Sequence, residues 1–141
     1  MKIWKHEFNL EMLNRMNEGT LGEHLNIVFT EIGDDYLVAT MPVDDRTVQP
    51  MKILHGGASV ALAETLGSVA SNLCIDTSKN FAVGLEINAN HLSKGRYNSH
   101  VVGTVRPVRV GKTVHVWNIE IKSPEGKLIC VSRLTTTIIN V

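Results

Sequence analysis

A run of small and apolar residues in the middle of the chain constrains the fold more than any other feature. Between Lys52 and Asp76 only one side chain is ionised, that of Glu64. Alanine and glycine occur on every side of this run, which predicts a helix over about residues 57–74 enclosed by other structure. A carboxylate in so apolar a segment is costly to desolvate unless it has partners, and such environments shift the pKa of catalytic acids. The alternative, that Glu64 simply points at water, stays open from composition alone.

Length and composition are those of an ordinary globular protein and predict a single domain over residues 1–141. Acidic and basic residues balance at 14 each, so no net field would attract nucleic acid or an anionic membrane. The two cysteines, Cys74 and Cys130, have no metal-site or Cys-x-x-Cys spacing, which is typical of free thiols in a reducing compartment. No signal-peptide pattern and no membrane-spanning run is apparent, so we expect a cytoplasmic protein.

The segments on either side of the central helix have the patterns of strands, apart from one short helix. That helix is expected over residues 9–18, with Asn9 as its cap and Gly19 at its end. Strands are expected over residues 26–31, 36–41, 81–91, 99–108, 113–122 and 128–139. The strand at 81–91 alternates through the apolar residues Val83, Leu85, Ile87 and Ala89. One long helix with about six antiparallel strands is an α+β plan, and a sheet curled around the helix would bury it.

The start of the central helix has the chemistry of an anion site. Two glycines, Gly56 and Gly57, follow His55 and let the backbone be approached closely, leaving free N–H groups at the positive end of the helix dipole. Such an end suits a developing oxyanion. However, Gly56 and Glu64 are eight residues apart, about 12 Å along a helix axis, whereas both would need to lie near 3 Å from one reacting centre. Two antiparallel helices meeting across a two-fold axis would solve this, which predicts a homodimer with composite sites.

Two more polar side chains are candidates for the same site. Ser68 lies one helical turn beyond Glu64 on the same face, where it would hydrogen-bond the carboxylate or a nearby water. Gln49, in the loop before the helix, would orient a water or a substrate oxygen. Close helix packing for Ser68 and plain solvation for Gln49 are the alternatives.

A basic cluster lies in a later turn of a chain that has no net charge. Arg106, Arg109 and Lys112 surround Gly111. Such a local patch fits the phosphates of a nucleotide-like carrier. The alternative is a solvated turn between two strands.

Several of these motifs together resemble a known family. They are Gln-Pro at 49–50, Leu-His-Gly-Gly-Ala-Ser at 54–59, Ala-Glu at 63–64, Val-Gly-Leu-Glu-Ile-Asn-Ala-Asn-His at 83–91 and Ser-Arg-Leu-Thr-Thr at 132–136. The chain is similar over nearly its whole length to the hotdog-fold acyl-CoA thioesterases. It most resembles the branch with the bacterial 1,4-dihydroxy-2-naphthoyl-CoA and 4-hydroxybenzoyl-CoA thioesterases.

The resemblance implies a hotdog domain that forms dimers with a continuous sheet, and tetramers from those dimers. It implies that Glu64 attacks the thioester or activates water, that the Gly56 N–H polarises the carbonyl with support from His55, and that Gln49 and Ser68 place the acyl carbonyl and the water. The histidines match no metal-site spacing, so no metal is expected, and no cofactor is expected because coenzyme A is part of the substrate. The coenzyme A contacts that it implies are Gly84, His91, Leu92, Ser93, Lys94, Arg109, Val110, Gly111, Lys112 and Thr113.

The function expected from this resemblance is hydrolysis of an aromatic acyl-CoA. The favoured substrate is 1,4-dihydroxy-2-naphthoyl-CoA, which would imply a role in menaquinone biosynthesis. One alternative is a proofreading thioesterase that removes aryl groups misloaded on an acyl carrier protein. Another is a noncatalytic acyl-CoA-binding hotdog module. No serine lies in a Gly-x-Ser-x-Gly elbow, so no serine-hydrolase triad is expected.

Overall fold

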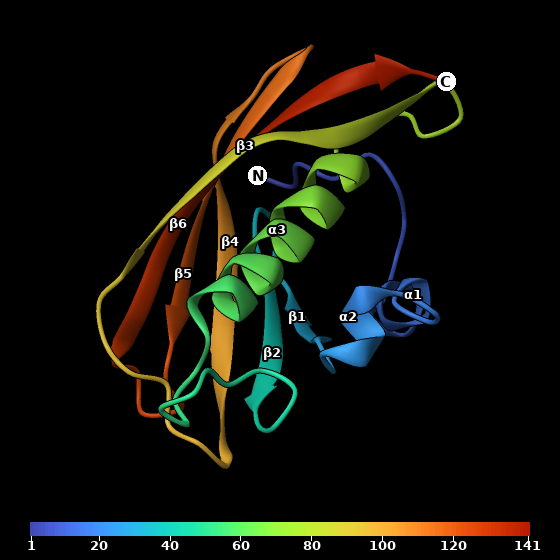
Figure 1. Cartoon of the computed structure of the whole chain (residues 1–141). Helices are drawn as coiled ribbons and strands as arrows, with labels where there is room; N and C mark the ends of the chain where they lie inside the picture. Colours follow the sequence, from blue (N-terminus) through green and yellow to red (C-terminus); the bar gives the residue numbers. More distant parts are fainter.

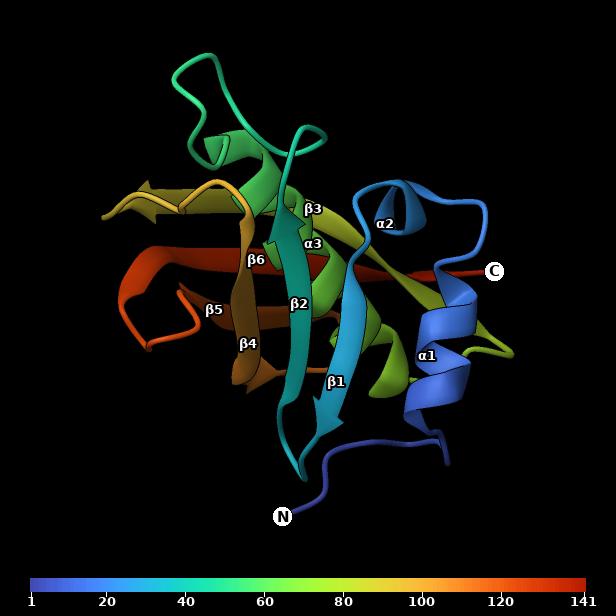
Figure 2. The same cartoon turned by 90° about the horizontal axis from the view of Figure 1, so that it is seen from below.

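The computed structural model describes all 141 residues and contains one antiparallel sheet of six strands in the order β1-β2-β4-β5-β6-β3. This confirms the α+β prediction of a sheet with one long helix. Figure 2, which views the sheet from below, shows β1, β2 and β4 side by side. In chain order the elements are α1 (Leu10–Met16), α2 (Leu21–His24), β1 (Val28–Ile32), β2 (Leu37–Val43), α3 (Gly56–Leu73), β3 (Asn80–His91), β4 (Ser99–Val110), β5 (Val114–Lys122) and β6 (Leu128–Asn140).

The long helix α3 crosses the concave side of the sheet (Figure 1). Leu62, Leu66 and Ala70 on its inner side are fully buried, in one core cluster with Trp117 and Leu134 of the strands. Removing these apolar side chains from water stabilises the helix against the sheet by roughly 25 cal/mol for each Å² buried. This packing fixes which face of α3 points away from the sheet.

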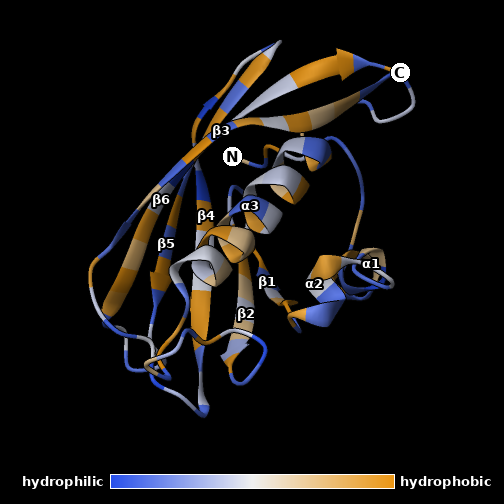
Figure 3. Cartoon of the chain, in the orientation of Figure 1, coloured by the Kyte–Doolittle hydropathy of each residue, from blue (hydrophilic) through white to orange (hydrophobic).

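The outer side of α3 is only half-covered in the single chain. Its half-exposed residues include Val60, Ala61, Glu64, Thr65 and Ser68. In Figure 3 the helix is drawn mostly in white and pale orange, because it consists largely of glycine, alanine and serine. Small residues of this kind allow close approach by another backbone.

Strand β3 is one of the two edge strands of the sheet and contains a β-bulge that the sequence pattern did not reveal. Gly84 pairs with Thr136 and Glu86 with Thr135, so Leu85 is an extra residue in the ladder. The expected uniform alternation through Leu85 is therefore wrong, and the Leu85 side chain is 63% exposed. A bulge of this type switches the side of the strand to which later residues point.

Two short helices precede the sheet. The Asn9 side chain accepts a hydrogen bond from the Met12 N–H at 2.9 Å, as expected for the cap of α1, whereas α2 was not predicted from the sequence. The four residues of α2 are too few for a helical period to be read. No helix of the protein is long and apolar enough to cross a membrane.

Candidate active site

The loop that leads into α3 is held in place by backbone pairing. Val48 and Leu54 form an isolated β-bridge, and the His55 N–H donates to the Thr47 carbonyl at 2.8 Å. The Gln49 side chain accepts a hydrogen bond from a backbone N–H within the same loop. The start of the helix and Gln49 therefore belong to one rigid unit.

The first N–H groups of α3 differ in their partners, and only one is free. The Nδ1 atom of His55 accepts from the Gly57 N–H at 2.8 Å, so any proton on the neutral ring resides on Nε2. The N–H groups of Ala58 and Ser59 donate to the His55 carbonyl at 3.0 and 3.2 Å. The Gly56 N–H has no hydrogen-bond partner within the chain. It is thus the donor that remains available to a ligand at the positive end of the helix.

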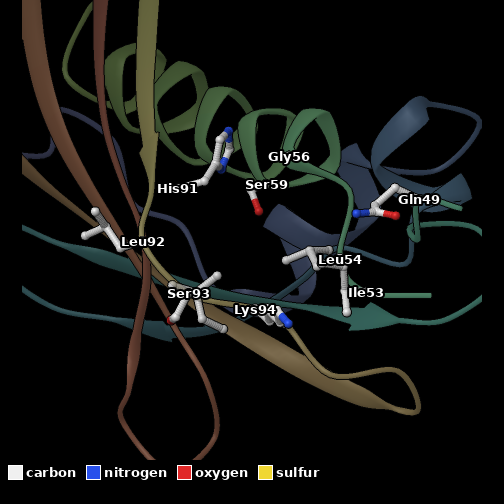
Figure 4. Close-up of a pocket in the computed structure, with 11 residues that line it drawn as sticks. Gln49, Ile53, Leu54, Gly56, Ser59, His91, Leu92, Ser93 and Lys94 are labelled. Atoms are coloured by element: carbon white, nitrogen blue, oxygen red, sulfur yellow. The ribbon is translucent and has the colours of Figure 1, made fainter. Parts of the chain in front are cut away.

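A cavity of about 390 Å³ opens beside Gly56. His91, at the end of β3, points toward the helix start in Figure 4, with its Nε2 atom 2.8 Å from where a Cβ of residue 56 would lie. A side chain at position 56 would displace this imidazole. The residues that line the cavity are Gln49, Ile53, Leu54, Gly56, Ser59, His91, Leu92, Ser93, Lys94, Gly95 and Ile129.

Glu64 and Ser68 are absent from this cavity. Glu64 is half-buried two turns further along α3, where its carboxylate lies against Gly84 of β3. It makes no hydrogen bond and no ion pair within the chain. The side chain of Ser68 is also half-buried and makes no hydrogen bond of its own. One chain therefore divides the predicted catalytic residues into two groups, one at the helix start and one at its middle.

The predicted coenzyme A contacts also fall into two groups. His91, Leu92, Ser93 and Lys94 line the cavity at the start of α3. The Ser93 hydroxyl is already engaged, since it donates to a β6 carbonyl at 2.6 Å. Lys94 is exposed and supplies a positive charge at the cavity. Gly84, by contrast, lies beside Glu64 and not in this cavity.

The second group lies in the turn between β4 and β5, beside the other end of α3. Val110, Gly111 and Lys112 line a different cavity of about 400 Å³, together with Cys74 and Asn80 near the C-terminus of the helix. Arg109, near the end of β4, and Thr113, directly before β5, are exposed beside this turn.

The basic cluster predicted around Gly111 is smaller than expected. Arg106 pairs with Asp35 at 3.6 Å and lies over the ring of Tyr36, with 4.3 Å from Cζ to the ring centroid. Arg109 and Lys112 have no acidic partner and remain available to an anion.

His115, to which the sequence assigned no role, supports this turn. The ring is 1% exposed, and its Nε2 atom lies 3.1 Å from the Gly111 carbonyl. Burial lowers the pKa of His115, so the neutral ring donates this hydrogen bond. The histidine fixes the backbone at the centre of the predicted phosphate-binding turn.

Sequence reasoning also missed two residues close to the site. Ser59 is 1% exposed and lines the first cavity one turn after Gly56. The only sequence feature that could have indicated Ser59 is its position three residues after Gly56 in the predicted helix. Asn72 pairs with both backbone polar groups of Ala82, at 2.9 and 3.3 Å, and no local sequence pattern indicates that contact.

Comparisons with known proteins agree with this geometry. The model of the thioesterase superfamily matches residues 51–130. The 1,4-dihydroxy-2-naphthoyl-CoA hydrolase of Escherichia coli K12 is 53% identical over 137 residues, 97% of this chain and 99% of that protein. The proofreading thioesterase EntH of Cronobacter sakazakii is 48% identical over 140 residues, 97% of this chain and 98% of that protein.

Solved structures extend the likeness to three dimensions. A crystal structure of a mutant of thioesterase PA1618 from Pseudomonas aeruginosa matches with a TM-score of 0.96 and 45% identity, covering 99% of this chain and all of that one. The crystal structure of thioesterase HI1161 from Haemophilus influenzae matches with a TM-score of 0.94 and 48% identity, covering 98% of this chain and 95% of that one. The long helix lying in a curved antiparallel sheet is the hotdog fold of these enzymes. The chain belongs to the thioesterase superfamily and is a thioester hydrolase.

Proposed function

We propose that the protein hydrolyses aromatic acyl-CoA thioesters at composite sites in a homodimer. The observation that carries the proposal is the free Gly56 N–H, which opens on a cavity that contains no carboxylate from its own chain. Glu64, the one acid within the apolar run, lies two helical turns beyond Gly56 on α3. A second copy of the chain would supply it.

The free surfaces of the chain support pairing through β3 and α3. Strand β3 is an edge of the sheet, and edge strands offer unpaired backbone groups to another strand. Asn72 covers the free edge only at Ala82, which leaves the stretch toward His91 open. An antiparallel β3–β3 pairing would continue the sheet and bring the half-exposed sides of the two α3 helices together.

The same two-fold arrangement would unite the two groups of coenzyme A contacts. Within one chain they lie at opposite ends of α3, which with 18 residues is about 27 Å long. In an antiparallel pair, the end of β3 that carries His91 lies beside the start of the partner's β3. There Asn80 shares a cavity with Gly111 and Lys112. Coenzyme A would thus run from the cavity of one subunit to the basic turn of the other.

The chemistry follows from these positions. The thioester oxygen accepts a hydrogen bond from the Gly56 N–H, whose location at the helix start stabilises charge that develops on that oxygen. Glu64 of the partner subunit then acts in one of two ways. As a nucleophile, it attacks the carbonyl carbon, the C–S bond breaks and water hydrolyses the resulting anhydride. As a general base, it takes a proton from water, whose oxygen attacks the carbonyl, and the proton passes to the leaving sulfur.

The acyl group is proposed from the relatives and from the shape of the site. The name of the Escherichia coli relative gives 1,4-dihydroxy-2-naphthoyl-CoA as its substrate. Ile53 and Leu54 provide apolar walls in the cavity, against which a flat aromatic ring would pack. A second candidate, hydrolysis of aryl groups on a carrier protein, is favoured by the similarity to the proofreading enzyme.

A panel of substrates tests the proposal. Free-thiol release is measured for naphthoyl-, hydroxybenzoyl-, short-chain and long-chain acyl-CoA, and for an aryl group on a carrier protein, with wild type and Glu64→Gln. We expect rapid turnover of the aryl-CoA esters and a loss of at least about a hundredfold in the variant. Turnover of the carrier-bound substrate alone would favour the second candidate. Equal rates for wild type and variant would contradict the role of Glu64.

Mixed dimers test the composite site. Glu64→Ala and His55→Ala subunits are each expected to be inactive as homodimers. When the two are unfolded together and refolded, half of the dimers carry both changes in different chains, so one of their two sites is intact. Recovery of about a quarter of the wild-type rate is therefore expected if sites are shared between subunits. Mixed dimers without activity would contradict sharing.

A further inference from the structure

A contact between α3 and β3 that the proposed chemistry does not explain involves Gly84. A Cβ atom at position 84 would overlap the Oε1 atom of Glu64 and would lie 3.4 Å from its Cδ. Because the Glu64 carboxylate has no hydrogen-bond or ion-pair partner in the chain, its position depends on what it packs against. The surface that it packs against is the bare backbone of β3.

The bulge at Leu85 explains why β3 can make this contact and still present His91 to the helix start. Gly84 and His91 are seven residues apart, so in a regular strand they would point to opposite sides. The extra residue in the ladder reverses the alternation between them. Ala82 and Gly84 therefore face α3 before the bulge, and Ile87, Ala89 and His91 face it afterwards.

We infer that Gly84 is a positioning residue for the Glu64 carboxylate, which occupies the space that a side chain at position 84 would fill. This inference rests on the proposed function of Glu64 and differs from the expected contact with coenzyme A. Any side chain at position 84 would push the Glu64 carboxylate away from β3 and toward the half-exposed outer side of α3. The backbone need not move, because the displaced atoms are the end of a flexible side chain.

The variant Gly84→Ala separates the two roles of this glycine. If Gly84 positions Glu64, the fold and the KM for the aryl-CoA ester stay close to wild type. The kcat should fall by about a hundredfold, the effect that a displacement of roughly 1 Å has on a reacting group. If Gly84 only contacts coenzyme A, KM rises and kcat is retained. Val83→Ala, at the neighbouring position on the other side of the strand, is the matched control and should leave kcat within about threefold.

A double-mutant cycle tests whether the effect passes through Glu64. Glu64→Asp shortens the side chain by one methylene, so its carboxylate no longer reaches residue 84. We expect Gly84→Ala to leave the residual kcat of Glu64→Asp unchanged, although it lowers that of wild type. Equal fold-losses in both backgrounds would overturn the inference.

A measurement without turnover keeps this inference separate from the proposed function. The side-chain carboxyl ¹³C resonance of Glu64, assigned with Glu64→Gln, should move in Gly84→Ala and stay in place in Val83→Ala. An unmoved resonance in Gly84→Ala would contradict the inference even if the enzyme is active. If the resonance moves in a protein that hydrolyses no thioester, the contact between Gly84 and Glu64 is supported and the proposed chemistry is rejected.

Discussion

A buried polar network on the inner side of α3 allows one prediction to be worked out in magnitude. The Ser71 hydroxyl accepts from the Trp117 indole N–H at 2.6 Å and shares a hydrogen bond of 2.8 Å with the Thr136 hydroxyl. All three side chains are fully buried, so no water would replace a lost partner. The network joins α3 to the neighbouring strands β5 and β6 of the sheet.

The variant Ser71→Ala removes both hydrogen bonds at once. The bond shared with the Thr136 hydroxyl is worth about 0.5–1.5 kcal/mol net, and the buried Trp117 N–H left without a partner costs about 1–3 kcal/mol. Together these predict a loss of about 1.5–4.5 kcal/mol in the free energy of unfolding. For a chain of this length that corresponds to a fall in Tm of roughly 5–15 °C.

The assay is urea unfolding followed by tryptophan fluorescence, at one fixed protein concentration so that any association is constant. Ser68→Ala on the outer side of the same helix is the matched control. It should leave stability within about 0.5 kcal/mol and lower turnover instead. A loss below about 1 kcal/mol for Ser71→Ala would refute the reasoning, and so would an equal loss in both variants.

Three further predictions concern charge and titration. Burial lowers the pKa of His115, so the folded protein keeps this ring neutral, whereas the unfolded chain protonates it below about pH 6.5. The contribution of the neutral ring to stability is therefore full above that pH and is lost as the pH falls. In the variant His115→Gln, the urea midpoint should decline less steeply in acid than it does in wild type. Burial raises the pKa of the Cys74 thiol to about 11, and Cys130 is buried as well. Neither cysteine should therefore react with Ellman's reagent at about pH 8 until the protein unfolds. Rapid labelling of the native protein would contradict this. Lys112→Ala should raise the KM for acyl-CoA with kcat retained and reduce the dependence of KM on ionic strength, whereas an unchanged KM would remove this lysine from the phosphate site.

The sequence alone determined the elements and the chemistry of the helix start. Asn9 as a cap, the alternation of β5 and the uninterrupted small-residue run of α3 are local patterns, and the structure confirms the predicted elements to within two residues at each end. The His-Gly-Gly motif also suffices to predict a free N–H at the helix start, because the first turn of any helix leaves such groups unpaired. Local propensity and helix geometry are enough for these features.

Only the tertiary structure decided how these residues are distributed. The contact of Gly84 with Glu64, the approach of His91 to Gly56 and the bulge at Leu85 all depend on how β3 packs against α3 and pairs with β6. An alternating apolar pattern predicts a strand but does not report one extra residue in its ladder, because the bulge is defined by the partner strand. The pairing of Arg106 with Asp35 likewise joins residues far apart in the chain. Contacts of this kind are set by packing between distant segments, about which a local sequence pattern carries no information.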